Sequence, residues 1–516
     1  MLMLRFNRCH SLVFIASLIF NQTLLAAPQF NPRTMGAKGD GKTKDTKAIQ
    51  QAIDAASKNG GTVVLDRGSF LSGTLHLKSR VTLQIEPGAT LLGSTEHADY
   101  ERAGRWLALL EAKDVTDINV TGGGVIDGQG ANLAADVTRL MKAGKLNDPP
   151  DSKRPGEKNR PQIIEFQNCK RVTVSNITLK DSSCWVQTYV SCDNLTLENV
   201  TVRSTAFWNN DGIDIVDGHH VLVKDCDVDS ADDGICLKSY KERSCVDVRV
   251  ENCKIRSSAS AFKFGTTSHG GFKQIVVRGL RIHDTLRSAV AIQSVDGAII
   301  DDVDIGDIEA KNTGNAISIR LGHRDKKDKP GSINNIRIHD MTVQIPDTVP
   351  DAGYPMAGPA VKEPHNIFPS SIVGIPGHSI SNVSLKNITL IIAGGGRREV
   401  AEVPLTRLKG IPEKEDKYPE FSMFGELPAW GFYVRHATNV TFENVKLNTV
   451  KPDYRAAFVF DDVQSPVLDH VAISSVGDNP VFVTRDVADI KFVETKRTDE
   501  SREWLRDVSD RKKKSE

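Results

Sequence analysis

A short pattern recurs along the chain and constrains its fold more than any other feature. Each copy alternates apolar and polar residues, breaks at Asn, Asp or Gly, and alternates again, as in Val172–Leu179 around Asn176. The alternation indicates two short strands, and the break indicates a bend, because short polar side chains and glycine tolerate turn geometry. The breaks are 23, 26, 27, 27 and 23 positions apart, at Asn176, Asn199, Asp225, Asn252, Gly279 and Asp302, and later copies centre on Asp340, Asn387 and Asn444.

A period in the twenties indicates units that stack on their neighbours and share one apolar column. We therefore predict an all-β fold, a single right-handed parallel β-helix. The chain lacks the L-x-x-L-x-L signature of a leucine-rich repeat, and a propeller blade needs about 40 residues. The helical pattern of residues 45–56, capped by Asp45 or Thr46, predicts a helix that covers the open N-terminal end of the solenoid.

The repeat also sets the domain organisation. A length of 516 residues would suggest about three domains. The repeat instead predicts one β-helix domain over residues 28–495. Its period lengthens where residues are inserted, at about 133–161 and 344–437, and insertions in solenoids often form the binding face. Residues 496–516 are mostly charged, and we expect a solvated tail.

The first 27 residues predict a signal peptide. Arg5 and Arg8 form a basic start, Leu12–Phe20 is apolar, and Ala26-Ala27 supplies small residues for cleavage. The apolar stretch is shorter than the about 20 residues needed to span a bilayer. We expect an exported protein, periplasmic or extracellular, without a membrane span.

Composition narrows the class of partner. Lysine plus arginine number 66 and aspartate plus glutamate also number 66. This neutral balance excludes a globally basic nucleic-acid-binding protein. We expect a monomer that does not bind nucleic acid.

Eight cysteines are present, and the seven that follow Cys9 all lie between Cys169 and Cys253. Their spacings match no zinc site. The clustering predicts either stacking within one region of the core or one to three disulfides, and both alternatives stay open.

Three carboxylates occur at equivalent places in successive repeats. Asp211-Gly-Ile is followed 21 residues later by Asp232-Asp233-Gly-Ile. Adjacent coils of a β-helix lie about 4.8 Å apart, so these side chains should cluster. Such a cluster is costly unless one carboxyl group keeps its proton or a cation is present. A protonated acid beside ionised bases suits glycoside hydrolysis. The other interpretations are plain turn residues, as at Asp225 and Asp302, and a calcium site.

With these motifs the chain resembles glycoside hydrolase family 28, the polygalacturonase family, over most of residues 30–475. The opening stretch Phe30–Gly41 is part of this resemblance, and the segment from Tyr418 to Arg435 resembles a bacterial branch of the family. Asn209-Asn210-Asp211 resembles its Asn-Thr-Asp motif, and Asp232-Asp233 resembles its Asp-Asp motif.

The resemblance implies an inverting, single-displacement hydrolysis of a pectic polyuronide without a cofactor or metal. It implies that Asp232 is the general acid, and that Asp211 and Asp233 hold and deprotonate the attacking water. Asn209 is a candidate substrate-binding residue, and Trp208 beside it could stack on a sugar ring as readily as pack in the core.

Two family motifs are absent. Ser258–Gly265 stands where Gly-His-Gly is expected, and His269 slightly later is a candidate site residue. Ala291-Ile292-Gln293 replaces the Arg-Ile-Lys whose cations bind a galacturonate carboxylate. Candidate replacement cations, each also readable as a solvated strand residue, are Lys238, Lys263, Arg320 and Arg324.

The favoured hypothesis is an exported glycosidase that acts on galacturonate-containing polymer. A rhamnogalacturonan hydrolase, or an exo-acting hydrolase of pectic oligosaccharides, is the nearest alternative. A polysaccharide lyase that uses calcium and a basic proton abstractor, and a non-catalytic carbohydrate-binding solenoid, are the others. The sugar, the linkage, the endo or exo mode and the disulfide pattern stay open.

Overall fold

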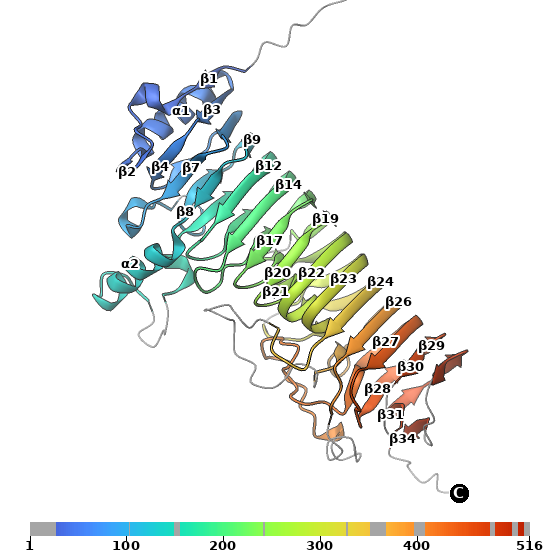
Figure 1. The fold of residues 1–516 in the computed structure, drawn as a ribbon. Helices are drawn as coiled ribbons and strands as arrows, with labels where there is room; N and C mark the ends of the chain where they lie inside the picture. The colour runs from blue at the N-terminus through green and yellow to red at the C-terminus, as the bar shows by residue number, and fades with distance from the viewer. Residues whose placement is uncertain are drawn as a thin grey trace, which may run out of the picture.

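The bends predicted from the repeat are turns in which one residue takes a positive φ. Asn176, Asn199, Asp225 and Asn252 have φ values of 49°, 52°, 54° and 52°. Asn and Asp tolerate this left-handed conformation better than other residues with side chains. Their recurrence winds the chain into a right-handed parallel β-helix, as predicted (Figure 1).

A computed structural model provides the coordinates. It describes residues 27–102, 104–148, 155–240, 243–326, 329–350, 368–396, 408–474, 480–497 and 504–509. The predicted signal peptide lies outside these residues, except for Ala27.

The strands form three parallel series that run the length of the solenoid, and long strands bend from one series into the next. The first series, which carries the candidate site, contains β5 (Leu75–His76), β8 (Ala108–Lys113), β11 (Gln162–Gln167), β13 (Gln187–Val190), β15 (Ile213–Val216), β18 (Ile235–Ser239), β21 (Phe262–Ser268), the ends of β22 (Gly271–Ser294) and β23 (Ile299–Leu321), β25 (Ser370–Val373), the start of β27 (Ala429–Thr449), β28 (Ala456–Gln464), β31 (Phe482–Ala488) and β34 (Leu505–Asp507).

The second series contains β1 (Gln29–Phe30), β3 (Gly61–Leu65), β6 (Val81–Ile85), β9 (Thr116–Thr121), β12 (Lys170–Lys180), β14 (Asp193–Ser204), β16 (His219–Lys224), β19 (Cys245–Glu251), β22, β23, β24 (Ser332–Ile345), β26 (Ile380–Ile392), β27, β29 (Val467–Asp469) and β32 (Lys491–Val493). The third contains β2 (Asp40–Lys44), β4 (Gly68–Ser72), β7 (Ala89–Gly93), β10 (Val125–Asp127), parts of the long strands, β17 (Asp227–Ser230), β20 (Lys254–Ser257), β30 (Ala472–Ser474) and β33 (Lys496–Arg497).

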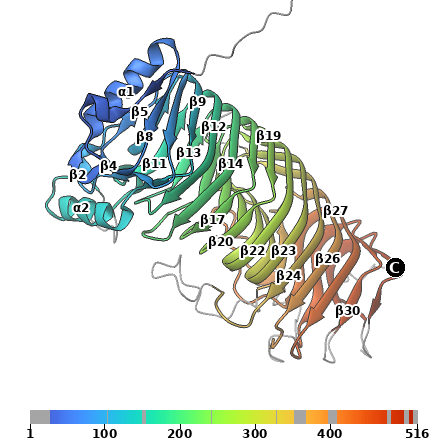
Figure 2. The same ribbon diagram turned by 45° about the horizontal axis from the view of Figure 1, so that its top comes forward.

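Helix α1 (Thr46–Asn59) covers the N-terminal end of the solenoid, as predicted (Figure 2). Its apolar face, which includes Ile49 and Ile53, is fully buried. Asp45 is the N-cap residue, as predicted, but its side chain forms no capping hydrogen bond. The Asp45 carboxylate instead accepts hydrogen bonds from the backbone N–H groups of Lys38 and Gly39, at 2.7 and 2.8 Å, and so fastens the preceding loop to the helix.

The solenoid interior is one continuous column of apolar side chains. Towards the C-terminal end, the rings of Phe432, Phe458 and Phe482 stack at centroid distances of 5.5 and 5.2 Å. All seven cysteines from Cys169 to Cys253 are buried and free. The structure therefore favours core stacking over disulfides among the described residues.

The predicted insertions differ in detail from the structure. The first contains most of helix α2 (Gly130–Lys142) and a short 3-10 helix, Glu157–Asn159. The predicted range 344–437 is interrupted, because β25 and β26 lie within it and β27 begins at Ala429. The insertion is thus two segments, residues 346–369 and 393–428.

The charged tail predicted from residue 496 also needs correction. Strands β33 and β34 lie inside it and pair with β30 and β31. The ring of Trp504 packs against Phe482 at a centroid distance of 5.0 Å. Coil stacking therefore continues to Asp507.

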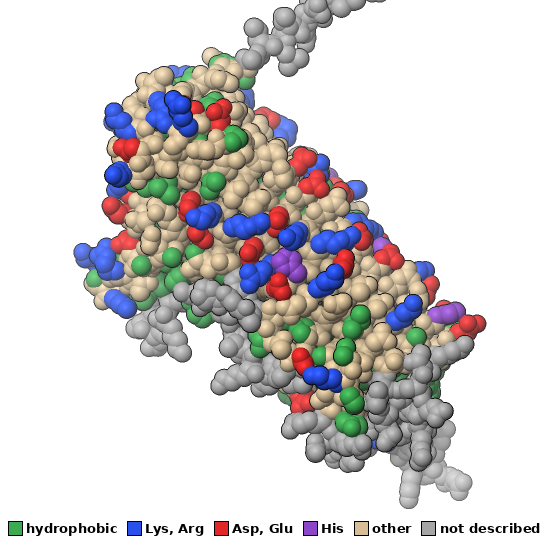
Figure 3. Space-filling view, in the orientation of Figure 1, with side chains coloured by type: hydrophobic (Ala, Val, Ile, Leu, Met, Phe, Trp, Pro, Cys, Tyr) green, Lys and Arg blue, Asp and Glu red, His purple; other side chains and the backbone are tan. Residues whose placement is uncertain are grey.

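Ion pairs between side chains on the outer surface link successive coils. Figure 3 shows positive and negative side chains side by side in a band across one face of the solenoid. Such pairs include Arg203 with Asp227 at 2.8 Å and Arg281 with Asp307 at 3.0 Å. Among the described residues, no helix is long and apolar enough to cross a membrane.

Candidate active site

The three aspartates lie immediately before two adjacent strands of the first series. Asp211 precedes β15, and Asp232-Asp233 precedes β18. The glycine that follows lets the coils approach, since a Cβ on Gly212 would lie 2.6 Å from the carbonyl oxygen of Gly234. The repeated Asp-Gly-Ile pattern therefore sets the backbone contact that brings the carboxylates together.

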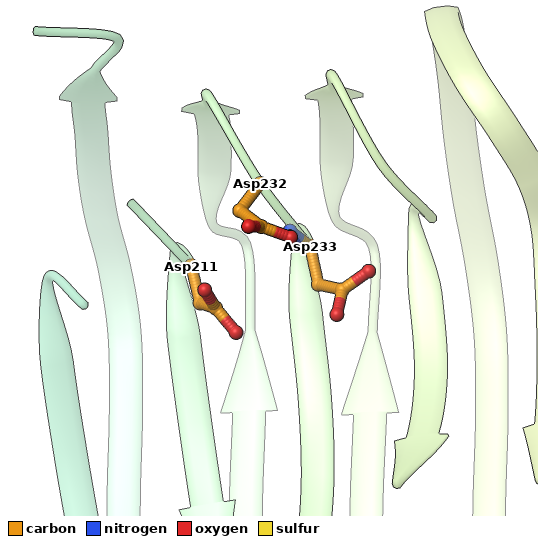
Figure 4. Close-up of side chains that lie close together, drawn as sticks. All are labelled: Asp211, Asp232 and Asp233. Atoms are coloured by element: carbon orange, nitrogen blue, oxygen red, sulfur yellow. The ribbon is translucent and has the colours of Figure 1, made fainter. Parts of the chain in front are cut away.

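The predicted cluster forms (Figure 4). One carboxylate oxygen from each of Asp211, Asp232 and Asp233 lies within 4.8 Å of the other two. Asp211 and Asp233 are buried, and Asp232 is half-buried. Asp232 also accepts a long hydrogen bond of 3.5 Å from the side-chain amide of Asn209.

Two buried lysines neutralise part of this charge. The Lys238 Nζ lies 2.8 Å from Asp211 Oδ2 and also contacts Asp214 on β15. The Lys263 Nζ lies 2.7 Å from Asp233 Oδ2. Both lysines line the pocket, but their ammonium groups are paired with site carboxylates. The structure therefore makes them internal counterions, which differs from their expected role as free cations for a substrate carboxylate.

Burial, together with the charges of Asp211 and Asp233, raises the pKa of Asp232 to about 7. Arg287 and Lys263 oppose this shift. Asp232 is thus suited to hold a proton near neutral pH, as a general acid must.

The neighbouring carboxylate behaves in the opposite way. Burial alone would raise the pKa of Asp233, but the charges of Lys263, Arg287 and Lys238 outweigh it and lower the pKa below its ordinary value. Asp233 is therefore ionised under conditions in which Asp232 is protonated, and the site holds one acid beside one base.

Asp211 and Asp214 share the charge of Lys238. Burial raises the pKa of Asp211 to about 7 and the pKa of Asp214 to about 6, while Lys238 lowers both. Burial alone would lower the pKa of Lys238, but the two carboxylates raise it well above its ordinary value. The lysine therefore stays protonated.

Asn209 and Trp208 have different surroundings. Asn209 lines the pocket, and its Oδ1 accepts a hydrogen bond of 2.8 Å from Arg160 Nη2. Trp208 is not among the pocket-lining residues. In its place Trp185 lines the pocket, with Lys238 Nζ 3.6 Å from its ring centroid. The aromatic wall comes from the preceding coil.

Of the remaining predicted residues, Arg324 lines the pocket, and His269 and Arg320 do not. Arg324 is paired with Asp296, with N–O distances of 2.9 and 2.7 Å. Arg320 is buried and donates to backbone carbonyls, including that of Gly374 at 2.8 Å. The structure therefore contradicts Arg320 as a substrate ligand, because its guanidinium is used to hold inserted loops.

The pocket has a volume of about 200 Å³ and includes residues that sequence reasoning missed. These are Glu157, Trp185, Thr266, Thr267 and Tyr418. Glu157 and Tyr418 come from the two insertions, so each insertion contributes one wall. No local sequence pattern marks these residues, although the insertions as a whole were predicted to form the binding face.

Three consecutive residues of the second insertion bind the catalytic coils. Tyr418 Oη lies 3.2 Å from Lys263 Nζ, and the Pro419 carbonyl accepts a hydrogen bond of 2.9 Å from Gln293 Nε2. Glu420 forms an ion pair of 3.0 Å with the buried Arg287. Gln293, which replaces an expected lysine, therefore fixes the insertion at the pocket edge.

A parallel β-helix that clusters three carboxylates before two adjacent strands, with one suited to act as an acid and one as a base, has the features of a glycoside hydrolase. Residues 58–352 match the family described as glycosyl hydrolases family 28. The match covers more than half of the chain, and the chain belongs to this family.

Individual relatives agree with this assignment. A probable polygalacturonase from Vitis vinifera is 26% identical over 60% of this chain and 59% of its own length. An exo-poly-alpha-D-galacturonosidase from Dickeya chrysanthemi is 29% identical over 41% of this chain and 42% of its own. The chain thus spans about half the length of these two relatives.

Solved structures support the fold. An exopolygalacturonase from Thermotoga maritima is 20% identical, with a TM-score of 0.55, over 70% of this chain and 87% of its own. The family 28 exopolygalacturonase from Yersinia enterocolitica is 18% identical, with a TM-score of 0.52, over 92% of this chain and 79% of its own.

Proposed function

We propose that this protein is an exported glycoside hydrolase that cleaves α-glycosidic bonds of pectic, galacturonate-containing polysaccharide by inverting acid–base hydrolysis. One observation carries the proposal. Asp232 and Asp233 are adjacent carboxylates whose pKa values are shifted in opposite directions: burial and neighbouring carboxylates raise the first, and cations, above all Lys263 at 2.7 Å, lower the second. Family membership and the polygalacturonase relatives support the substrate class.

In this proposal Asp232 protonates the glycosidic oxygen as the bond breaks. Asp233 and Asp211 bind the attacking water, and the ionised Asp233 takes its proton. Lys238 and Lys263 keep the bases oriented through buried ion pairs of 2.8 and 2.7 Å. General acid–base catalysis of this kind contributes about 10²–10⁴-fold to the rate.

Stereochemistry provides a separate test. The nearest carboxylate oxygens lie within 4.8 Å of one another, whereas carboxyl groups in most inverting glycosidases are about 6.5–9.5 Å apart. Inversion therefore rests on the family resemblance and on the presence of two carboxylates that can share one water. NMR of the first-formed product should show inversion at the anomeric carbon. Retention would overturn this part of the proposal.

A chain-end mode of attack, including attack on rhamnogalacturonan, is the second candidate. The contacts of Tyr418, Pro419 and Glu420 with the catalytic coils favour it, because they bound the pocket beside Asp233. Size analysis of early products separates the modes, since attack at chain ends releases short products while the polymer stays long.

The protonation state of the two site lysines disfavours the lyase alternative. A lyase needs a neutral base, but the pKa values of Lys238 and Lys263 are both raised well above their ordinary value. Reducing-end assays on homogalacturonan and rhamnogalacturonan, with absorbance at the wavelength of unsaturated products, distinguish a hydrolase, a lyase and a binding protein. Unsaturated products whose formation stops with chelator would establish a lyase, and no turnover would leave a binding protein.

A further inference from the structure

Several residues that precede strands of the first series line the candidate site, and an arginine outside the pocket lining occupies the equivalent place in an earlier coil. Arg105 lies shortly before β8, as Trp185 precedes β13 and Asp211 precedes β15. Because these strands stack in order, Arg105 lies on the N-terminal side of the catalytic aspartates, opposite the side bounded by Tyr418.

The Arg105 guanidinium contacts two aromatic rings, and its charge acts on the buried Glu165 carboxylate without an ion pair between them. Its guanidinium carbon lies 4.1 Å from the ring centroid of Tyr240 and 4.8 Å from that of Trp106. Trp106 packs on Trp185 at a centroid distance of 4.3 Å. Since Trp185 lines the pocket, this aromatic cluster connects Arg105 to the pocket wall.

The backbone beneath Arg105 is also fixed. The buried carboxylate of Glu165 accepts hydrogen bonds of 3.0 Å from the N–H groups of Arg105 and Trp106. Arg102 donates to the Arg105 carbonyl oxygen at 2.7 Å. The Glu165 carboxylate therefore binds backbone N–H groups, and the Arg105 side chain is exposed.

The other arginines around the pocket already have polar partners. Arg160 donates to backbone carbonyls and to Asn209, Arg287 pairs with Glu420, and Arg324 pairs with Asp296. For Arg105, the described residues provide ring contacts but no ion pair. Its guanidinium lies over the rings, and its side chain is exposed.

We propose that Arg105, supported by Trp106 and Tyr240, binds a uronate carboxylate of the substrate at a subsite on the N-terminal side of Asp211. The proposal rests on the proposed pectic substrate. An arginine fork binds a carboxylate through two parallel hydrogen bonds, and an aromatic platform reduces the freedom it loses on binding. This subsite would recognise galacturonate in a chain that lacks the Arg-Ile-Lys cations.

Binding is measured by calorimetry in the Asp232→Asn background, so that hydrolysis does not interfere. The probes are an oligogalacturonate and the same oligomer as its methyl ester, which removes the negative charges. We expect Arg105→Gln to weaken binding of the acid about 10- to 100-fold, the effect of losing a charged hydrogen bond, and to leave the ester unchanged. Arg105→Lys should recover only part of the loss, because it keeps the charge without the fork.

Arg249→Gln is the matched control, since Arg249 is also exposed but lies on β19 in the second strand series. It should bind both probes as the parent does. Circular dichroism checks that each variant is folded. The subsite is overturned if Arg105→Gln binds the acid as tightly as the parent does. It is also overturned if the variant loses equal affinity for acid and ester, which would indicate a packing role. A parent that does not bind the acid would overturn it as well.

Turnover by the wild-type protein separates this inference from the proposed function. Hydrolysis of galacturonan with no effect of Arg105→Gln on acid binding would refute the subsite alone. Selective acid binding through Arg105 with no turnover on any pectic substrate would keep the subsite and refute the hydrolase.

Discussion

Lys263 and Asp233 form a buried ion pair across one coil step, with the lysine Nζ 2.7 Å from the carboxylate Oδ2. Asp232, the preceding residue, has no such contact with Lys263 and lies close to Asp211. Burial and the neighbouring carboxylates raise the pKa of Asp232, whereas cations, of which Lys263 has the largest effect, lower the pKa of Asp233. Two adjacent carboxyl groups are thereby separated into an acid and a base.

The rate should fall on the alkaline side of neutral pH. Asp232 must be protonated to act as an acid, and its pKa is raised to about 7. We expect kcat/KM to decrease about tenfold per pH unit above about 7. The pKa of Asp233 is lowered, so its base function should persist to pH values below the usual aspartate range. A profile that stays flat well above pH 7 would contradict the assignment of Asp232.

Asp232→Asn should reduce kcat by about 10²–10⁴-fold while the fold is kept, because the variant has no acidic proton to donate. Asp225→Asn is the matched control. Asp225 is a turn residue with a φ of 54°, and Asn takes the equivalent turn at Asn199 and Asn252. Steady-state rates on the same pectic substrate compare them. Near-full activity of the Asp232 variant would refute its role.

Lys238→Met should destabilise the protein by about 3–5 kcal/mol, because it leaves the buried Asp211 and Asp214 without a counterion. Denaturant unfolding measures the change. Adding Asp214→Asn should restore part of the loss, since it removes one of the two unpaired carboxylates. If the single variant is as stable as the wild type, the ion pairs do not contribute as described.

The substitutions Arg287→Gln and Glu420→Gln should shift the alkaline limb of the pH profile of kcat/KM in opposite directions. Arg287 lowers the pKa of Asp232, so Arg287→Gln should move the limb to higher pH. Glu420 pairs with Arg287 at 3.0 Å, so Glu420→Gln frees that positive charge and should move the limb to lower pH.

The other charged groups that face Asp232 are unchanged in both variants, namely Asp211, Asp233 and Lys263. Profiles of kcat/KM measure the two shifts. A purely structural role for the pair would lower the rate in both variants without moving the limb, and shifts of the same sign would contradict the electrostatic explanation.

The repeat made the fold and the centre of the site predictable. Each turn residue named from the pattern, such as Asn176 or Gly279, has a positive φ. The register then places Asp211 beside Asp232 and Asp233, because each coil step repeats the same position relative to its strand. These inferences need only local alternation and a constant period.

The rest of the site depends on contacts that no local pattern encodes. Tyr418 meets Lys263 across 155 residues, through an insertion whose path the repeat does not constrain. The sequence analysis gave Lys238 and Arg320 as candidate cations for the substrate or as solvated strand residues. In the structure Lys238 pairs with a buried carboxylate, and Arg320 donates hydrogen bonds to the backbone of inserted loops. Charge alone did not reveal which cations were already paired.

The seven reduced cysteines in the solenoid interior have a consequence for how the protein matures. An unfolded chain presents all of these thiols at once, whereas the folded chain buries every one. In an oxidising compartment, random disulfides form within seconds to hours, and β-rich chains fold in milliseconds to seconds. In such a compartment, the yield of folded protein therefore depends on whether the coils fold before the thiols are oxidised. A mutation that slows folding of the coils near Cys169–Cys253 would reduce the amount of active protein even where it leaves the stability of the folded state unchanged.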